Sequence, residues 1–294
     1  MAFTLAEYKK GKDDPRLQGL IELYLDNAPF LNHTELVNVI GSAVTHTAET
    51  TLNTTAFRAV GAAYTASEGV VTETTTNLKI AGGKITVDRA LLKMQGEQRF
   101  AWSQAMQVKS LARLMSYSFF KGDGTSNTFS GLQSLNTVSV ANGATALSLA
   151  KLDEAVATIE GSNTVMYVGT GMYSRLSAAM RNTSVAGNIY YEPNQFGQQV
   201  MYYAGIPIVR AGKDGSDAEI LDFSETTSTT SIYLVSSDEN GTMFFQNDGI
   251  QYYDIDKGSD VASGYDIEWI GAPAILNPAS CVRVSGITNA AVTA

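Results

Sequence analysis

The chain has 294 residues, of which 44% are hydrophobic, so it can form one large domain or two closely packed ones. Its net charge of −9 and the lack of a basic run argue against sequence-specific nucleic-acid binding. The single cysteine, Cys281, excludes an intrachain disulfide framework. The sequence begins without a signal-peptide core and has no apolar run near the ~20 residues of a membrane helix. We therefore expect a protein that folds in a reducing cytoplasm.

The first 27 residues carry a short helical pattern. Its apolar positions are Leu17, Leu20, Ile21, Tyr24 and Leu25, and Lys9, Lys10, Lys12 and Arg16 make the segment locally basic. A solvated terminal arm explains this pattern. An arm that reaches a neighbouring subunit or an internal partner is the alternative.

Residues 36–92 are rich in threonine and indicate β-structure. We expect a strand at residues 55–60, and strands at 78–80 and 84–87 around a bulge or tight turn at Gly82-Gly83. The polar stretch 62–77 contains few residues that could enter a core. Since an isolated two-stranded ribbon is marginal in water, we interpret this region as an extended arm lying on a neighbouring subunit. A mobile loop is the alternative.

The strongest pattern predicts one long helix over residues 95–121. Phe100, Val108, Leu111, Met115 and Phe119 recur at helical spacing, and Leu114 widens the apolar stripe. Gly122-Asp123-Gly124 supplies residues that end a helix. At 1.5 Å per residue the helix is ~40 Å long. We interpret it as a spine on which the sheets are arranged.

Helices and strands alternate after the spine, which predicts a compact mixed α/β domain. The expected helices are 149–160 and 171–181, and the expected strands are 164–168, 219–223, 232–235 and 243–246. A hairpin is expected around Ala204-Gly205, and Asn247-Asp248-Gly249 is expected to turn the chain into a strand at 250–255. The last strands, 265–272 and 281–284, are expected to pair with each other beneath the spine.

No residue set predicts an active site. Gly169-Thr170-Gly171 follows a strand and opens a helix, as in a dinucleotide fingerprint, but Ser174 stands where the third glycine would be. Close packing of a strand–turn–helix explains these glycines, and a nucleotide-binding α/β enzyme is the competing hypothesis. Asp214, Asp217 and Glu219 lack the spacing of an EF-hand loop, so we expect solvated turns. We predict no catalytic residue, cofactor or metal ligand.

Several short segments, in this order, resemble the major capsid proteins of tailed bacteriophages (Caudovirales). They are Arg58-Ala59-Val60, Ser67-Glu68-Gly69, Phe120-Lys121-Gly122-Asp123-Gly124-Thr125, Gly131-Leu132, Gly205-Ile206-Pro207-Ile208, Trp269-Ile270-Gly271 and Ser285-Gly286-Ile287. The resemblance is to the Hong Kong ninety-seven-like, or Johnson, fold and covers about residues 36–287.

This resemblance implies an α+β fold with a fixed order of parts. Residues 1–35 would be an N-terminal arm, and 36–92 an extended β-hairpin (the E-loop) with flanking strands. Residues 93–135 would be the spine helix and connector of a peripheral P-domain. Residues 136–255 would form an axial, mixed α/β A-domain, and 256–294 would return to P-domain strands.

The implied function is that of a structural, non-enzymatic protein. Hexamers and pentamers would assemble into an icosahedral head that encloses double-stranded DNA without sequence-specific binding, away from any membrane. The resemblance also implies a portal, a separate scaffold protein, assembly in the host cytoplasm and a final place in the virion. We expect a noncovalent shell, because Lys79, Lys84 and Asn277 cannot be aligned with a cross-linking motif. The candidate intersubunit contacts are Phe57, Arg58, Tyr64, Glu68, Lys79 and Lys84, and an encapsulin-like shell around cargo is the alternative.

Overall fold

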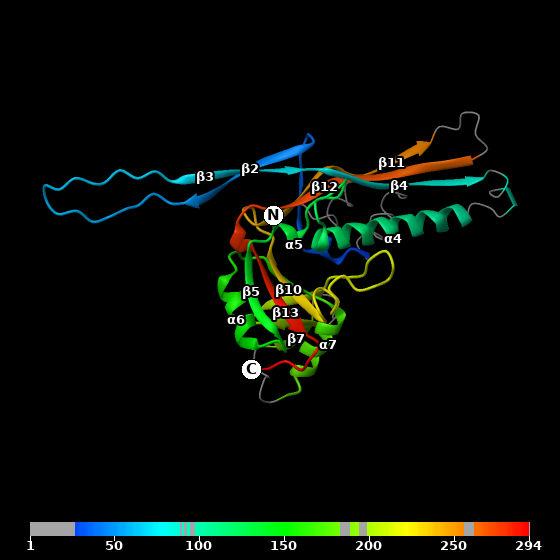
Figure 1. The fold of residues 1–294 in the computed structure, drawn as a ribbon. Helices are drawn as coiled ribbons and strands as arrows, with labels where there is room; N and C mark the ends of the chain where they lie inside the picture. Colours follow the sequence, from blue (N-terminus) through cyan, green and yellow to red (C-terminus); the bar gives the residue numbers. More distant parts are fainter. Residues whose placement is uncertain are drawn as a thin grey trace.

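The computed structural model describes residues 27–88, 90, 93–94, 98–182, 189–193, 199–255 and 262–293. Within them the fold is mixed α+β, with a four-stranded, a seven-stranded and a two-stranded sheet. Figure 1 shows the two-stranded sheet projecting as an arm from one side of the body. The four-stranded sheet extends to the other side above the long helix, and the seven-stranded sheet lies below with its helices.

The four-stranded sheet has one covered and one open face. Its order is β1 (Glu35–Asn38), β11 (Thr242–Ile255), β12 (Ala262–Ile275) and β4 (Lys79–Asp88). Side chains alternate between the two faces of a strand, so each strand presents every second residue to the covered face. The buried residues on that face include Ile85, Ile267 and Trp269. Helix α4 (Gln98–Lys121) covers this face and contributes Val108 and Leu111 to the same core.

The long helix is confirmed, and at 24 residues it is about 36 Å long. Four of the predicted core residues, Val108, Leu111, Met115 and Phe119, are buried. The prediction for Leu114 was wrong: it is 47% exposed, on the side of the helix turned away from the sheet. Residues 95–97 and the side chain of Phe100 lie outside the described part.

The expected turn at Gly82-Gly83 is instead a straight strand. β4 pairs antiparallel with β12 in continuous register from Lys79 to Asp88. A Cβ atom at Gly82 would lie 2.5 Å from the carbonyl oxygen of Ile267, so only glycine allows this close approach of the two backbones.

The arm consists of β2 (Ala43–Thr51) and β3 (Val70–Asn77). The prediction of a strand at residues 55–60 was wrong, since the chain is irregular between 52 and 59. The threonine-rich segments form the ladder instead, and the hydroxyl groups of the opposed Thr45 and Thr75 lie 3.2 Å apart. Phe57, Val60 and Tyr64 therefore lie outside the ladder, at the tip.

The seven-stranded sheet forms the second layer of the body. Its order is β5 (Val138–Thr145), β13 (Cys281–Thr288), β10 (Thr229–Ser236), β6 (Thr164–Val168), β9 (Ile206–Arg210), β8 (Gln199–Tyr203) and β7 (Ile189–Pro193). Met166 and Val168 of β6 share a core with helices α6 (Leu149–Thr158) and α7 (Thr170–Ala179). The predicted helices and the hairpin at Ala204-Gly205 are confirmed.

Three expectations for this half of the chain were wrong. Residues 281–284 belong to β13, which pairs with β10 and β5 rather than with residues 265–272. Residues 219–223 form turns. Asp248 and Gly249 have φ angles of 56° and 71° and form a bulge, after which β11 continues along β12.

The two layers share one hydrophobic core around the end of α4. The short helix η1 (Pro29–Asn32) enters it, and Phe30 stacks on Phe119 with ring centroids 4.3 Å apart. The last part of the expected N-terminal arm (1–35) is thus core, with Ala28, Phe30 and Leu31 fully buried. Residues 1–26 lie outside the described part.

Candidate assembly surface

The tip of the arm, residues 52–69 between β2 and β3, exposes apolar side chains to solvent. Phe57 and Val60 are completely exposed, and Tyr64 is 67% exposed. Leu52, Val70 and Val71 are also largely exposed. Clustered exposed apolar residues are typical of a surface that binds another protein.

Local bonds give the tip a defined shape. The backbone amide of Thr54 donates to Ser67 Oγ at 2.8 Å, and this hydroxyl donates to the Thr54 carbonyl oxygen at 3.1 Å. Across the turn, the Arg58 guanidinium donates to the carbonyl oxygen of Ala62 at 3.2 Å and lies over the ring of Tyr64. Such preorganisation reduces the entropy lost when the tip binds a partner.

The structure separates the six candidate contact residues into two groups. Phe57, Arg58, Tyr64 and Glu68 lie on the irregular tip of the arm, whereas Lys79 and Lys84 lie in β4. One subunit does not bring the groups together, and their role in contacts stays a prediction.

Sequence reasoning missed four other exposed apolar residues of the arm. They are Leu52, Val60, Val70 and Val71. Leu52 and the pair Val70-Val71 are flanked by polar residues or glycine, and this was a usable signal. Val60 lies among alanines and gave no such signal.

The open face of the four-stranded sheet is the second exposed surface. Lys84 stands opposite Asp266, and Ile80 stands opposite Ile270. Ile80 and Tyr253 are 64% and 50% exposed, although they belong to a regular sheet. The face combines apolar side chains with charges of both signs, as interfaces between subunits do.

A cavity of about 160 Å³ lies at the root of the arm. Thr75 and Asn77 line it from the arm, and Lys79, Thr128 and Pro273 line it from the body. The arm is therefore only partly packed where it joins the body.

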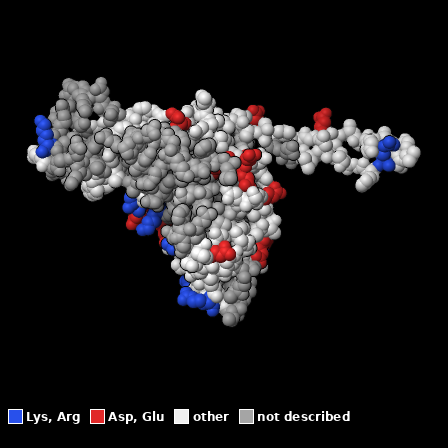
Figure 2. Space-filling view, turned by 180° about the vertical axis from the view of Figure 1, so that it is seen from behind, with Lys and Arg blue, Asp and Glu red and all other residues white. Residues whose placement is uncertain are grey.

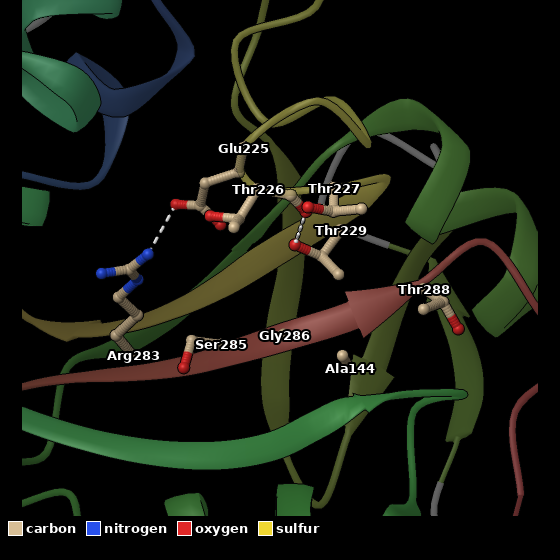
Figure 3. Close-up of a pocket in the computed structure, with 9 residues that line it drawn as sticks. All are labelled: Ala144, Glu225, Thr226, Thr227, Thr229, Arg283, Ser285, Gly286 and Thr288. Atoms are coloured by element: carbon tan, nitrogen blue, oxygen red, sulfur yellow. Dashed lines mark hydrogen bonds and ion pairs between the residues drawn. The ribbon is translucent and has the colours of Figure 1, made fainter.

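A larger cavity of about 450 Å³ lies beside β10 and β13 (Figure 3). Arg283 donates to Glu225 Oε1 at 2.7 Å and, through Nε, to Ser231 Oγ at 3.1 Å. Ser231 in turn donates to the other carboxylate oxygen of Glu225. Because both oxygens are engaged and the Glu225 side chain is only 7% exposed, this pair serves structure rather than acid–base chemistry.

The Gly169-Thr170-Gly171 segment is explained by packing. A Cβ atom at Gly169 would lie 1.8 Å from the carbonyl oxygen of Leu221, and one at Gly171 would lie 2.7 Å from Cε2 of Phe223. The 221–223 segment thus occupies the side from which a dinucleotide would approach these glycines.

The acidic residues that were considered for metal binding form turns. Asp214 accepts hydrogen bonds from Ser216 and the Ala218 amide, and the Ser216 hydroxyl is the main cause of the lowered pKa of Asp214. The described residues contain no group of three or more His, Cys, Asp or Glu side chains that could hold a metal ion. Among them, no helix has the length and apolar character needed to span a membrane.

Comparison with known proteins identifies the fold. No protein-family model matches the chain, and no curated protein matches its sequence. Among solved structures, the capsid of a native GTA particle matches with a TM-score of 0.68 and 13% identity over 90% of both chains. The SrpI encapsulin of Synechococcus elongatus matches with a TM-score of 0.68 and 10% identity, over 100% of this chain and 99% of that one.

The chain has the capsid–encapsulin fold. A structure of Microbacterium phage Oxtober96 matches as well, with a TM-score of 0.61 and 11% identity over 89% of this chain and 91% of that one. The expected α+β class is therefore confirmed. The capsid–encapsulin fold accounts for the projecting arm, the long helix and the two packed sheets as parts of one architecture.

Proposed function

We propose that this chain is the major capsid protein of a tailed bacteriophage, a member of the Hong Kong ninety-seven-like family. It self-assembles through hexamers and pentamers into an icosahedral shell around double-stranded DNA. The observation that carries the proposal is the preorganised arm tip, whose apolar residues are exposed in a chain with the capsid–encapsulin fold. Several of the matching structures are of phages or of a capsid.

The mechanism of this function is geometric rather than catalytic, and it needs no cofactor. The arm of one subunit lies on the next, with Phe57, Arg58, Tyr64 and Glu68 on the arm. Lys79 and Lys84 belong to the receiving sheet, where a lysine complements an acidic residue of the arm. Many such contacts, each modest, make a closed shell cooperative and long-lived.

The parts of the fold correspond to the domains of such a shell. The four-stranded sheet with α4 forms the peripheral P-domain, the arm is the E-loop, and the seven-stranded sheet with α6 and α7 forms the axial A-domain. The division expected from sequence has β11 in the A-domain and β13 in the P-domain. Because β11 pairs in the four-stranded sheet and β13 in the seven-stranded sheet, we assign β11 to the P-domain and β13 to the A-domain instead.

The remaining partners follow from the same proposal. A separate scaffold protein and a portal take part in assembly in the host cytoplasm, and the subunit ends in the virion. The shell is held noncovalently. The net charge of −9 suits a shell that contains DNA without strong adhesion.

An encapsulin-like compartment is the second candidate. The observation that favours it is the match to the SrpI encapsulin, which spans practically the full length of both chains. The contents of purified particles separate the candidates: a co-purified enzyme found by mass spectrometry supports the compartment, and its absence supports the phage head.

Negative-stain electron microscopy of the purified full chain, together with light scattering, tests the proposal. We expect closed polyhedra, tubes or six-fold capsomers. A species that stays monomeric or dimeric at every concentration, also with a scaffold protein added, contradicts it.

A further inference from the structure

The two flanks of the seven-stranded unit differ in charge. Helix α6 packs on β5 and β13, at one end of the strand order, whereas α7 packs on β9, towards the other end. Figure 1 shows α6 and α7 on opposite sides of this unit. We call the segment 138–160, with β5 and α6, the acidic flank, and the segment 170–210, with α7 and β7 to β9, the basic flank. Within one subunit the two segments meet at Tyr203 of β8, whose hydroxyl donates to the Leu149 carbonyl oxygen at 3.5 Å and to the Asp153 carboxylate.

The charges of these flanks are equal and opposite. The acidic flank contains Lys151, Asp153, Glu154 and Glu160, which is a net charge of −2. The basic flank contains Arg175, Arg181, Arg210 and Glu192, which is a net charge of +2 in a protein of net charge −9. In the lower half of the molecule, Figure 2 shows acidic side chains along one edge and basic ones at the lowest part of the opposite edge, where a group of both signs lies higher up.

Charged side chains on both flanks are accessible to a partner. On the acidic flank, Glu154 is half exposed and has only Lys151, one helical turn away, as its ion-pair partner among the described residues. On the basic flank, Arg181 and Arg210 are exposed. Exposed charges carry little energy alone, but they align and orient two surfaces that approach each other.

The basic flank also carries exposed aromatic rings. Arg210 lies over Tyr173 at 4.5 Å, and Tyr190 stacks on Tyr202 with centroids 5.8 Å apart. Tyr190 and Tyr191 remain more than one-third exposed. Tyrosine and arginine together are typical of the residues that dominate binding energy in protein interfaces.

We propose that the acidic flank of one copy of this chain binds the basic flank of the next copy, head to tail, and that this pairing builds the capsomer ring. A head-to-tail contact uses two different surfaces of the same chain, and it closes into a ring when the rotation fits. The opposite charges supply two such surfaces. If one copy were reversed, two acidic flanks or two basic flanks would meet and repel each other. This inference rests on the proposed function, because it concerns contacts within its hexamers and pentamers.

Two charge-exchange variants test the pairing. Glu154→Lys with Glu160→Lys changes the acidic flank from −2 to +2, and Arg181→Glu with Arg210→Glu changes the basic flank from +2 to −2. Each variant alone has two flanks of like charge. We expect the concentration needed for assembly at low salt to rise about tenfold or more for each variant.

Mixing the variants gives the decisive result. In an equimolar mixture, complementary flanks meet only when the two variants alternate around the ring. Alternation is possible in six-membered rings and impossible in five-membered ones. We therefore expect electron microscopy to show hexamers, sheets or tubes in the mixture, without five-fold vertices.

The control variant Lys93→Glu with Lys109→Glu changes the net charge as much as the basic-flank variant, but outside both flanks. It is expected to assemble like the wild type. If the wild type forms rings, either of two results would overturn this inference alone. The first is that either flank variant assembles normally by itself, and the second is that the mixture assembles no better than its components. A wild-type chain that forms no rings, also with a scaffold protein added, would overturn the proposed function as well.

Discussion

The ring of Phe120 in α4 meets the ring of Tyr167 in β6 nearly edge-on, with centroids 5.2 Å apart and planes at 67°. Phe120 also contacts Tyr233 of β10, at 6.0 Å between centroids. Since α4 belongs to the layer of the four-stranded sheet and both tyrosines to the seven-stranded sheet, this contact joins the two layers.

Phe120→Ala tests the junction. Removing a fully buried ring leaves a cavity, so we expect the free energy of unfolding to fall by about 3–5 kcal/mol in urea denaturation. The control Leu114→Ala, on the exposed side of the same helix, is expected to change it by about 0.5 kcal/mol or less. Equal effects of the two substitutions would show that Phe120 does not join the layers.

Gly171→Ala tests the packing explanation of the glycine segment. The new methyl group would press against the ring of Phe223, so we expect a loss of about 1–3 kcal/mol in thermal unfolding. Phe223→Leu in the same chain should recover part of this loss. Gly215→Ala is the matched control, because nothing lies within 4 Å of that position. Similar stability of both alanine variants would contradict the explanation.

Arg283→Met tests the ion pair beside the larger cavity. The substitution leaves the Glu225 carboxylate buried without its cation, and we expect a loss of about 3 kcal/mol or more. Adding Glu225→Gln should restore most of the stability. Lys151→Met breaks an exposed pair instead and should cost about 0.5 kcal/mol or less. Chemical denaturation measures all three, and a small loss for Arg283→Met alone would count against a buried role.

Asp123 gives a prediction for acid pH. Hydrogen bonds from Thr125, with a smaller contribution from Thr128, lower the pKa of Asp123 to about 2, from an ordinary value of about 3.9. A lowered pKa in the folded state adds stability above the ordinary pKa, and this stability is lost as the pH falls through about 2. Asp123→Ala should therefore be less stable than the wild type at neutral pH, and the difference should shrink towards pH 2. A difference independent of pH would contradict the role of the ionised carboxylate.

The arm tip gives a prediction that separates folding from assembly. Phe57→Ser with Val60→Ser removes two fully exposed side chains, so we expect the stability of the subunit to change by about 0.5 kcal/mol or less. Light scattering should nevertheless show that shells no longer form. Ile40→Ser, equally exposed but outside the arm, serves as the control. Shells as stable as those of the wild type would refute the contact role of the tip.

The sequence by itself determined the elements whose pattern is local. The spacing of Val108, Leu111, Met115 and Phe119 specified the long helix, since one face of a helix needs only residues three and four apart. Ala204-Gly205 between two apolar runs specified a hairpin for the same reason. Of the four candidate contact residues at the arm tip, Tyr64 and Glu68 lie in the stretch 62–77, which is too polar to form a core. Phe57 and Arg58 precede that stretch, and their role in contacts came from the resemblance to phage capsid proteins.

Only the tertiary structure decided which strands meet. β13 lies between β5 and β10, which start more than 140 and 50 residues before it, so no local pattern specifies its partners. Leu114 is exposed because the sheet covers only one side of α4. Gly82 permits a straight strand because the backbone of β12 passes close by, which the sequence around Gly82 does not encode. Likewise, the opposite charges of α6 and α7 belong to two different surfaces only because the fold places these helices on two flanks of one sheet.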